Sequence, residues 1–235
     1  MKHHLFLIFG LFLICGWNWQ THPAFVESIY YQLSDADRSY FNVTALQEGS
    51  LAPDRDFHDT RYHHYPPSYN LTLYWLQKAR TSYDQGNFPE ASYAFGVASH
   101  YVSDSFAAPH NIEKESSKDH SFYERQASER YMLVPCPSNF SLVDINATLL
   151  RATATGKTWS SWLATKDSNY PEQAVAHSME PLYHLFWQTF NITCVKKETF
   201  YGQGDWLPEH PGTLIAVAVT FYCFLEILIS LIKPQ

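Results

Sequence analysis

Apolar residues recur every three or four positions through most of the chain, which is the spacing of one face of an α-helix. Alternating apolar and polar positions, which predict strands, are scarce. The segment 50–69 is rich in Pro, Asp, His and Tyr, and we expect an irregular loop carrying polar groups there. The pattern therefore predicts an all-α, compact multi-helix domain. The expected helices cover residues 23–33, 71–83, 89–106, 120–134, 142–163 and 172–190.

Two further apolar runs lie at the ends of the chain. Residues 5–15 are too few to cross a hydrocarbon core about 30 Å thick, but they are typical of a secretory signal. We expect cleavage after Gly16, with an uncleaved signal anchor as the alternative. The second run, interrupted by Glu226, is long enough for one membrane-spanning helix. The sequence thus predicts a signal peptide at 1–16, an exported domain at 17–212 and a transmembrane helix at 213–232.

Further features place this domain on the extracytoplasmic side of the membrane. It contains several Asn-x-Ser/Thr acceptor sites, which together are typical of an exported, glycosylated surface. Their asparagines are Asn42, Asn70, Asn139, Asn146 and Asn191. Of the cysteines, Cys136 and Cys194 belong to the exported domain. These two can pair in an oxidising compartment, although the sequence does not show that they are close.

The composition changes this picture in two ways. The formal net charge is -7 with neutral histidine, which argues against a broad nucleic-acid-binding surface because such surfaces are usually basic. The chain also contains 12 histidines, many of them clustered with carboxylates. Imidazole and carboxylate groups both bind zinc, so the composition indicates a metal site.

The densest cluster is the run from His100 to His110. His100 and Asp104 are four residues apart, so on a helix they point the same way and can present an imidazole and a carboxylate to one point. His110 follows Pro109, where the helix should end, and the chain can turn back there. A second pair with the same spacing is His120 and Glu124. Either pair alone is also compatible with a solvated helix surface, but together they indicate a metal centre.

At this point the sequence resembles the zinc-dependent phospholipase C family, which is related to the single-strand-specific zinc nucleases. The run from Phe95 to His110 is similar to the family's His-x3-Asp-x5-His helix, and His120-Ser-Phe-Tyr-Glu124 is similar to the following His-x3-Glu. Three earlier stretches also resemble the family: Trp17-Asn-Trp-Gln-Thr-His22, Gly49-Ser-Leu-Ala-Pro53-Asp54 and His63-His64-Tyr65-Pro66. The resemblance extends from Trp17 to about Val134.

The resemblance implies a cleft that holds two or three zinc ions. The first ion would be held by Asp54, His64, His100 and Asp104, and the second by His110, His120 and Glu124. The third would be held by the Trp17 amine and carbonyl, His22 and a bridging Asp104, and it requires cleavage before Trp17. His63 is an alternative to His64, and Asp56 is an alternative to Asp54.

The expected activity is hydrolysis of a membrane lipid phosphodiester, with release of a phosphorylated head group. Clustered zinc ions can hold a hydroxide at neutral pH and orient it toward phosphorus. Asp54 is the candidate catalytic residue, since it can orient or deprotonate the attacking water. One alternative is an exported nuclease or other phosphodiesterase, which the step from Trp17 to His22 favours. Another is a catalytically inactive metal-binding surface protein.

Overall fold

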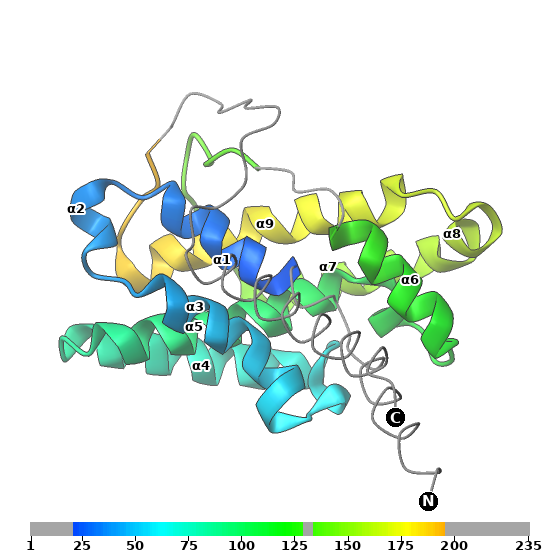
Figure 1. The fold of residues 1–235 in the computed structure, drawn as a ribbon, viewed down its shortest axis with the longest axis horizontal. Coiled ribbons are helices and arrows are strands. Elements are labelled where there is room, and N and C mark those ends of the chain that lie inside the picture. The colour runs from blue at the N-terminus through cyan, green and yellow to red at the C-terminus, as the bar shows by residue number, and fades with distance from the viewer. Residues whose placement is uncertain (1–20, 129–133, 196–235) are drawn as a thin grey trace, which may run out of the picture. The chain divides into compact units, whose positions relative to one another are not determined.

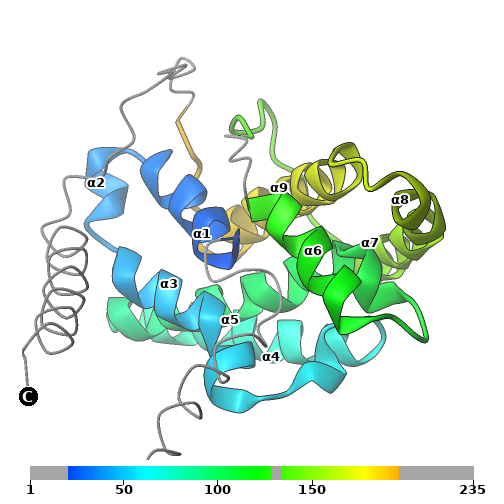
Figure 2. The same cartoon turned by 45° about the vertical axis from the view of Figure 1, so that its right-hand side comes forward.

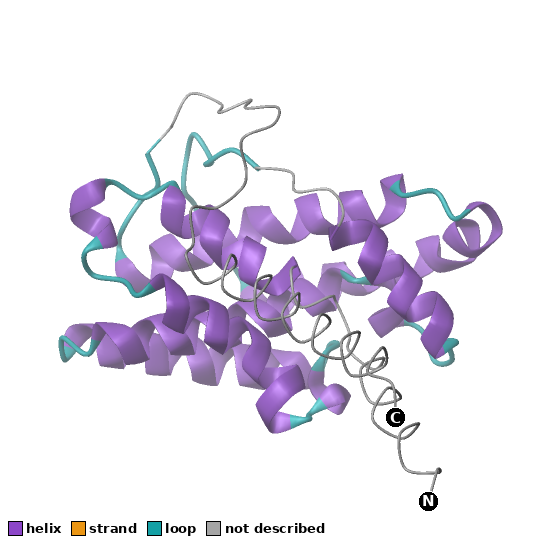
Figure 3. Ribbon diagram, viewed as in Figure 1, coloured by secondary structure: helices purple, strands orange, loops and turns teal. Residues whose placement is uncertain are grey.

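The computed structural model describes residues 21–128 and 134–195, and within these residues it contains helices and no strand (Figure 3). The all-α prediction is therefore confirmed for the described part of the chain. Its α-helices are α1 Thr21–Tyr31, α2 Asp35–Arg38, α3 Val43–Ala52, α4 Pro67–Asp84, α5 Phe88–Phe106, α6 Ser117–Ser128, α7 Ile145–Ala152, α8 Trp159–Thr165 and α9 Asn169–Phe190. Short helical segments are η1 Pro53–Phe57, η2 Thr60–Tyr62, η3 Ala108–Asn111 and η4 Thr153–Thr158.

The predicted end segments are not part of this description. The signal peptide at 1–16 and the transmembrane helix at 213–232 lie outside the described residues, as does Trp17. Among the residues that are described, no helix has the length and apolar character needed to cross a membrane.

Helix α5 is the centre of the domain. All of its residues from Ala91 to Phe106 except Tyr93 are buried. It packs against α3, α4 and α9, and α1 lies against α3 (Figures 1 and 2). A helix that is covered on several sides can carry buried polar residues only where they have partners, so the position of the polar residues along α5 locates the site.

The two halves of α5 bury different side chains. Phe95, in the first half, packs against Phe186 and Phe190 of α9 with ring centroids 5.0 and 5.6 Å apart. Phe41 joins the same cluster from the chain between α2 and α3. These aromatic contacts stabilise the helix from within the apolar core. His100 and Asp104 lie in the second half of α5. The aromatic contacts that fix the helix are therefore in the other half and do not involve these two residues.

A close crossing of α3 and α5 depends on two glycines. A Cβ atom on Gly96 would lie 2.2 Å from the carbonyl oxygen of Leu46, and one on Gly49 would lie 2.1 Å from that of Tyr93. No side chain fits at such distances, so only glycine permits this approach. The crossing brings the carbonyl oxygen of Ser50 to 2.7 Å from His100 Nδ1. It thereby places the end of α3 against the polar half of α5.

Two expected elements differ from the structure. The predicted helix 142–163 is divided into α7, η4 and α8. The division occurs at η4, which packs against η3. The two backbones are so close that a Cβ on Gly156 would lie 2.4 Å from the Asn111 carbonyl oxygen. The predicted loop 50–69 instead contains the end of α3, both η1 and η2, and the start of α4. In both places tertiary contacts decide the local structure, and helical periodicity does not contain that information.

A disulfide joins Cys136 and Cys194, whose Cα atoms are 5.9 Å apart. It links the chain before α7 to the chain just after α9. Gln32, after α1, holds the same region: its side-chain amide donates to the Val134 carbonyl oxygen, and its own carbonyl oxygen accepts from the Val195 amide. The pairing that the sequence left open is therefore present, and it fixes the end of α9 to α1 and the 134–144 segment.

Replacing Gly96 with alanine tests the helix crossing. Helix propensity alone would make Gly96→Ala stabilising by roughly 0.5–1 kcal/mol. The clash with Leu46 reverses the sign, because overpacking typically costs roughly 1–3 kcal/mol. We expect a lower Tm in thermal unfolding, by roughly 2–4 °C for each kcal/mol lost.

Gly86→Ala is the matched control, since Gly86 has a φ of +73° and no atom within 4 Å of an added Cβ. We expect this substitution to destabilise the protein by roughly 1–2 kcal/mol through the left-handed backbone alone. It does not affect the crossing of α3 and α5. We expect His100 and its surroundings to be unaffected by this control, whereas Gly96→Ala should also weaken metal binding. A Gly96→Ala protein as stable as wild type would contradict the close approach.

Candidate metal centre

Six segments of the chain bring the candidate ligands together. The ligands and their positions are His22 on α1, Asp54 on η1, His63 directly after η2, His100 and Asp104 on α5, His110 on η3, and His120 and Glu124 on α6. Helix α5 ends at Phe106 because Ala107 is extended, with φ -74° and ψ 124°, and Pro109 follows. The change of direction returns His110 toward the helix that it has just left.

The carboxylate of Asp104 lies at the centre of this cluster. It is 1% exposed, and four imidazoles surround it. Its Oδ2 is 2.8 Å from His63 Nδ1, 3.1 Å from His100 Nε2 and 3.7 Å from His110 Nε2. Its Oδ1 is 3.3 Å from His22 Nε2. Burial alone would raise the pKa of Asp104, but the imidazoles of His100, His110 and His22 outweigh burial and hold this pKa well below the usual aspartate range.

Three groups of side chains are arranged so that each could hold a metal ion. Within each group the ligand atoms lie within 4.8 Å of one another. The groups are His22, Asp54 and His100; His63, Asp104 and His110; and His110, His120 and Glu124. The last group has the membership that the sequence predicted for the second ion. The other two divide the predicted ligands differently, because His22 lies beside Asp54 and His100.

Several imidazoles in the cluster are oriented through their second ring nitrogen. Such contacts to a carbonyl, carboxylate or hydroxyl are typical of metal-binding histidines, because they fix the ring and its tautomer. The contacts are His100 Nδ1 with the Ser50 carbonyl oxygen, His22 Nδ1 with Ser103 Oγ at 3.1 Å, His63 Nε2 with Asp59 Oδ1 at 3.2 Å, and His120 Nδ1 with Glu115. In each case the other ring nitrogen is directed toward the cluster carboxylates.

The buried polar atoms of the cluster fit a bound cation. His100 Nε2, His110 Nε2, Asp104 Oδ1 and Glu124 Oε2 are all buried and have no hydrogen-bond partner within the protein. Leaving one buried polar atom unsatisfied costs about 1–3 kcal/mol, and four such atoms at one place require an explanation. Imidazole nitrogens and carboxylate oxygens are the donors that zinc prefers together, so these residues fit zinc.

The α6 end of the cluster has its own electrostatics. His120 Nε2 is 2.5 Å from Glu124 Oε1, and His110 Nε2 is 3.7 Å from the same oxygen. Burial raises the pKa of Glu124 to about 8. Burial would lower the pKa of His120, but hydrogen bonds to Glu115 and Glu124 outweigh it and raise this pKa to about 10. Protons and a metal cation would therefore compete for the same two groups, the Glu124 carboxylate and the His120 imidazole.

The structure brings His63 into the cluster, and not His64. His63 is 2% exposed, and its Nδ1 lies 2.8 Å from Asp104 and 3.6 Å from Asp54. His64, which the resemblance assigned, belongs to none of the three groups. The sequence held a signal for this choice, because Asp59 and His63 repeat the four-residue spacing of the other pairs.

Asp54, and not Asp56, faces the cluster. Asp54 Oδ1 lies 3.6 Å from His63 Nδ1 and 3.8 Å from His100 Nε2. The exposed Asp56 carboxylate instead accepts hydrogen bonds from Arg55. Trp17, the predicted donor of an amine and a carbonyl, lies outside the described residues, so the structure describes only His22 from that part of the predicted third site.

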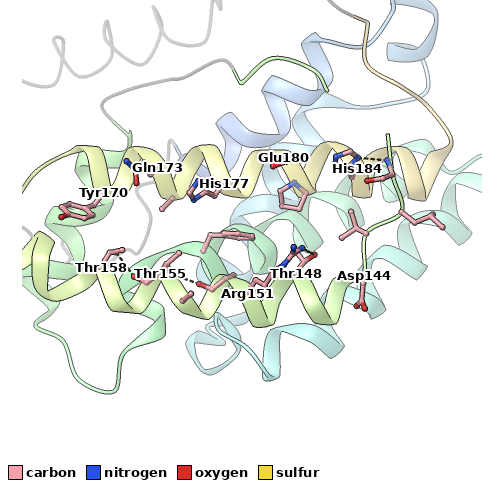
Figure 4. A pocket seen from close by; sticks show the side chains of 18 of the residues that line it. Asp144, Thr148, Arg151, Thr155, Thr158, Tyr170, Gln173, His177, Glu180 and His184 are labelled. Carbon is pink, nitrogen blue, oxygen red and sulfur yellow. Dashed lines mark hydrogen bonds between the residues drawn. The ribbon is translucent and has the colours of Figure 1, made fainter. Parts of the chain in front are cut away.

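A cavity of about 550 Å³ lies between α9 and the chain of α7 and η4 (Figure 4). Gln173, His177, Glu180 and His184 line it from α9, and Arg151, Thr148 and Thr155 face them. None of the predicted site residues lines it. The cavity therefore shares no ligand residue with the metal centre.

Comparison with known proteins identifies the family. The family model for zinc-dependent phospholipase C matches residues 21–190, which include every described candidate ligand. The match continues through α9, beyond the stretch in which the sequence motifs were recognised. A search of curated proteins gives no match. The suspected relationship is thus confirmed, and the chain belongs to the zinc-dependent phospholipase C family.

Proposed function

We propose that this protein is a zinc-dependent phosphodiesterase that hydrolyses membrane phospholipids and releases a phosphorylated head group. Family membership supports phosphodiester hydrolysis. The observation that carries the proposal is the set of buried, unpartnered nitrogen and oxygen atoms around Asp104, because these atoms provide zinc donors at one place. Zinc bound there would polarise a phosphoryl oxygen and make bound water acidic near neutral pH.

The donors have different exposures, and this suggests different roles. The side chain of Asp54 is 23% exposed, whereas those of Asp104 and Glu124 are 2% and 1% exposed. The two buried carboxylates can bind and bridge metal ions but cannot reach a substrate. Asp54 contacts His63 and His100 and still reaches solvent, so it is the group that can orient or deprotonate the attacking water.

A serine-nucleophile mechanism has a superficial counterpart here, and its geometry is wrong. Ser103, His22 and Asp104 form a connected chain. However, Ser103 is fully buried, and its hydroxyl donates to the His100 carbonyl oxygen at 3.0 Å. The hydroxyl is thus left to accept from His22 Nδ1, and it cannot give its proton to that imidazole for attack on a substrate. A metal-activated water needs no such nucleophile.

The alternative functions receive less support. A catalytically inactive metal-binding protein would not need the partly exposed Asp54 beside a complete set of buried donors. A nuclease with the same metal centre is favoured by the spacing from Trp17 to His22, but the net charge of -7 gives no general attraction for a polyanion.

The proposed location is the extracytoplasmic face of a membrane, with a signal at 1–16 and a tether at 213–232. Two observations support it. All of the predicted glycosylation asparagines are exposed, so each is accessible to modification. The Cys136–Cys194 disulfide is a bond that persists in oxidising compartments. A tether raises the effective concentration of the site near lipid head groups, which favours a lipid substrate.

The first prediction concerns the metal. The wild-type chain should contain more than one zinc ion by elemental analysis. Asp104→Asn should weaken zinc binding by more than the roughly 10- to 100-fold typical of outer-shell changes, because Asp104 lies between the groups. Phosphodiesterase activity should fall with the zinc content. Asp84→Asn, which removes a carboxylate paired with Arg80 on the surface, is the control and should retain both. Full zinc content in Asp104→Asn would contradict the assignment.

The second prediction concerns the substrate. The zinc-loaded full chain, offered mixed phospholipid vesicles and single-stranded DNA together, should release phosphorylated head groups faster than nucleotides. Asp54→Asn should slow the reaction by about 10²- to 10⁴-fold, the usual contribution of a general base. Nucleotide release without head-group release from any phospholipid would support the nuclease and contradict the lipid substrate.

The third prediction concerns processing. Protein isolated from its native membrane should begin at Trp17 in N-terminal sequencing, and N-glycosidase treatment should lower its mass. The free Trp17 amine would then be available as a zinc donor, which an internal amide is not. A retained Met1 would remove that donor and leave the donors around Asp104 intact.

A further inference from the structure

Asp59 lies between η1 and η2, and both of its carboxylate oxygens are occupied. Oδ1 lies 3.2 Å from His63 Nε2 and accepts its proton in a hydrogen bond. Oδ2 accepts from the hydroxyl of Tyr101, a fully buried residue that follows His100 on α5. The carboxylate therefore connects a cluster histidine on a loop to the central helix.

The backbone around Asp59 is also held at two points. Its amide donates to the Pro53 carbonyl oxygen at 3.3 Å, and its own carbonyl oxygen accepts from the Tyr62 amide at 2.9 Å. The first bond joins Asp59 to the start of η1, where Asp54 lies, and the second joins it to η2. The position of the carboxylate is thus defined by the same short segments that supply two cluster residues.

This arrangement determines which nitrogen of His63 can bind a metal. A carboxylate that accepts from Nε2–H keeps the proton on that nitrogen and leaves the lone pair on Nδ1. Nδ1 is the atom that lies 2.8 Å from Asp104 and 3.6 Å from Asp54. His100 needs no such support from a side chain, because it is on a helix and contacts the Ser50 carbonyl oxygen. His63 follows a single turn, so its ring depends on Asp59.

We propose that Asp59, held by Tyr101, is a positioning residue that fixes the tautomer and ring orientation of His63 for metal binding. This inference rests on the proposed metal centre and goes beyond it, because Asp59 belongs to none of the three metal-ligand groups. Both carboxylate oxygens already accept hydrogen bonds, so Asp59 acts through the imidazole and not as a ligand.

The test compares two substitutions at this position in the full chain in detergent. Asp59→Leu removes the acceptor, whereas Asp59→Asn keeps an oxygen that can accept from His63 Nε2–H and an amide that can donate to the Tyr101 hydroxyl. Zinc affinity is measured by competition with a chelator, and ligand geometry is measured from the visible absorption of the cobalt-substituted protein. We expect Asp59→Leu to weaken metal binding by about 10- to 100-fold and to change the cobalt spectrum. Asp59→Asn should restore most of the affinity and the wild-type spectrum.

Two further variants complete the design. Asp56→Leu removes a charge from the same segment, but its carboxylate is bonded to Arg55, so metal affinity and the spectrum should not change. Tyr101→Phe removes only the hydroxyl that holds Asp59, and we expect a smaller loss of affinity in the same direction. It tests the inference even where Asp59→Leu does not fold.

Opposite results have distinct meanings. Wild-type affinity and spectrum in Asp59→Leu would overturn the positioning role. Equal losses in Asp59→Leu and Asp59→Asn would also overturn it, because Asp59 would then act through its charge or as a ligand. Unchanged affinity and spectrum in Tyr101→Phe would overturn the proposal as stated, because His63 would then be positioned without the contact between Tyr101 and Asp59. A wild-type chain that binds neither zinc nor cobalt would contradict the metal centre itself.

Discussion

A carboxylate with almost no exposure to solvent sets the main constraint on this fold. An ionised group taken out of water is strongly destabilising unless charges and hydrogen bonds replace its hydration. Asp104 obtains these partners from His100 on its own helix and from His22, His63 and His110, which arrive on other segments. Each segment that carries one of these imidazoles must therefore lie close to the Asp104 carboxylate. The carboxylate and the imidazoles together form a site for a cation.

The apolar half of α5 supplies packing that stabilises the helix and offsets the cost of burying these polar groups. Contacts of Phe95 with α9 stabilise the helix where no charge is present, and the glycine-mediated crossing with α3 brings the Ser50 carbonyl oxygen to His100. Close packing of two backbones is thus used to place an acceptor accurately. Ser50 and Ser103, which contact the second ring nitrogens of His100 and His22, are held on helices, and this favours metal binding without rearrangement.

Helical spacing was sufficient to predict much of the cluster. His100 with Asp104, and His120 with Glu124, share a helix face whatever the tertiary structure, so their pairing follows from four-residue spacing. The choice of His63 over His64 is less direct. The four-residue spacing of Asp59 and His63 is a signal for it, but this pair is not on one continuous helix, so only the observed contact with Asp59 decides it. The break of the 142–163 helix and the Cys136–Cys194 bond likewise depend on contacts between distant segments. Periodicity describes one segment at a time and cannot contain them.

The disulfide would have a mechanical consequence if the proposed segment at 213–232 tethers the chain to a membrane. A pulling force transmitted along the backbone enters the domain at Cys194, immediately after α9. There it is shared with Cys136 through a covalent bond and with Gln32 through the Val195 amide. The force is therefore divided among three segments of the chain before it reaches the last turn of α9. The candidate metal ligands all precede Cys136 in the sequence, so they lie outside the direct line of such a force.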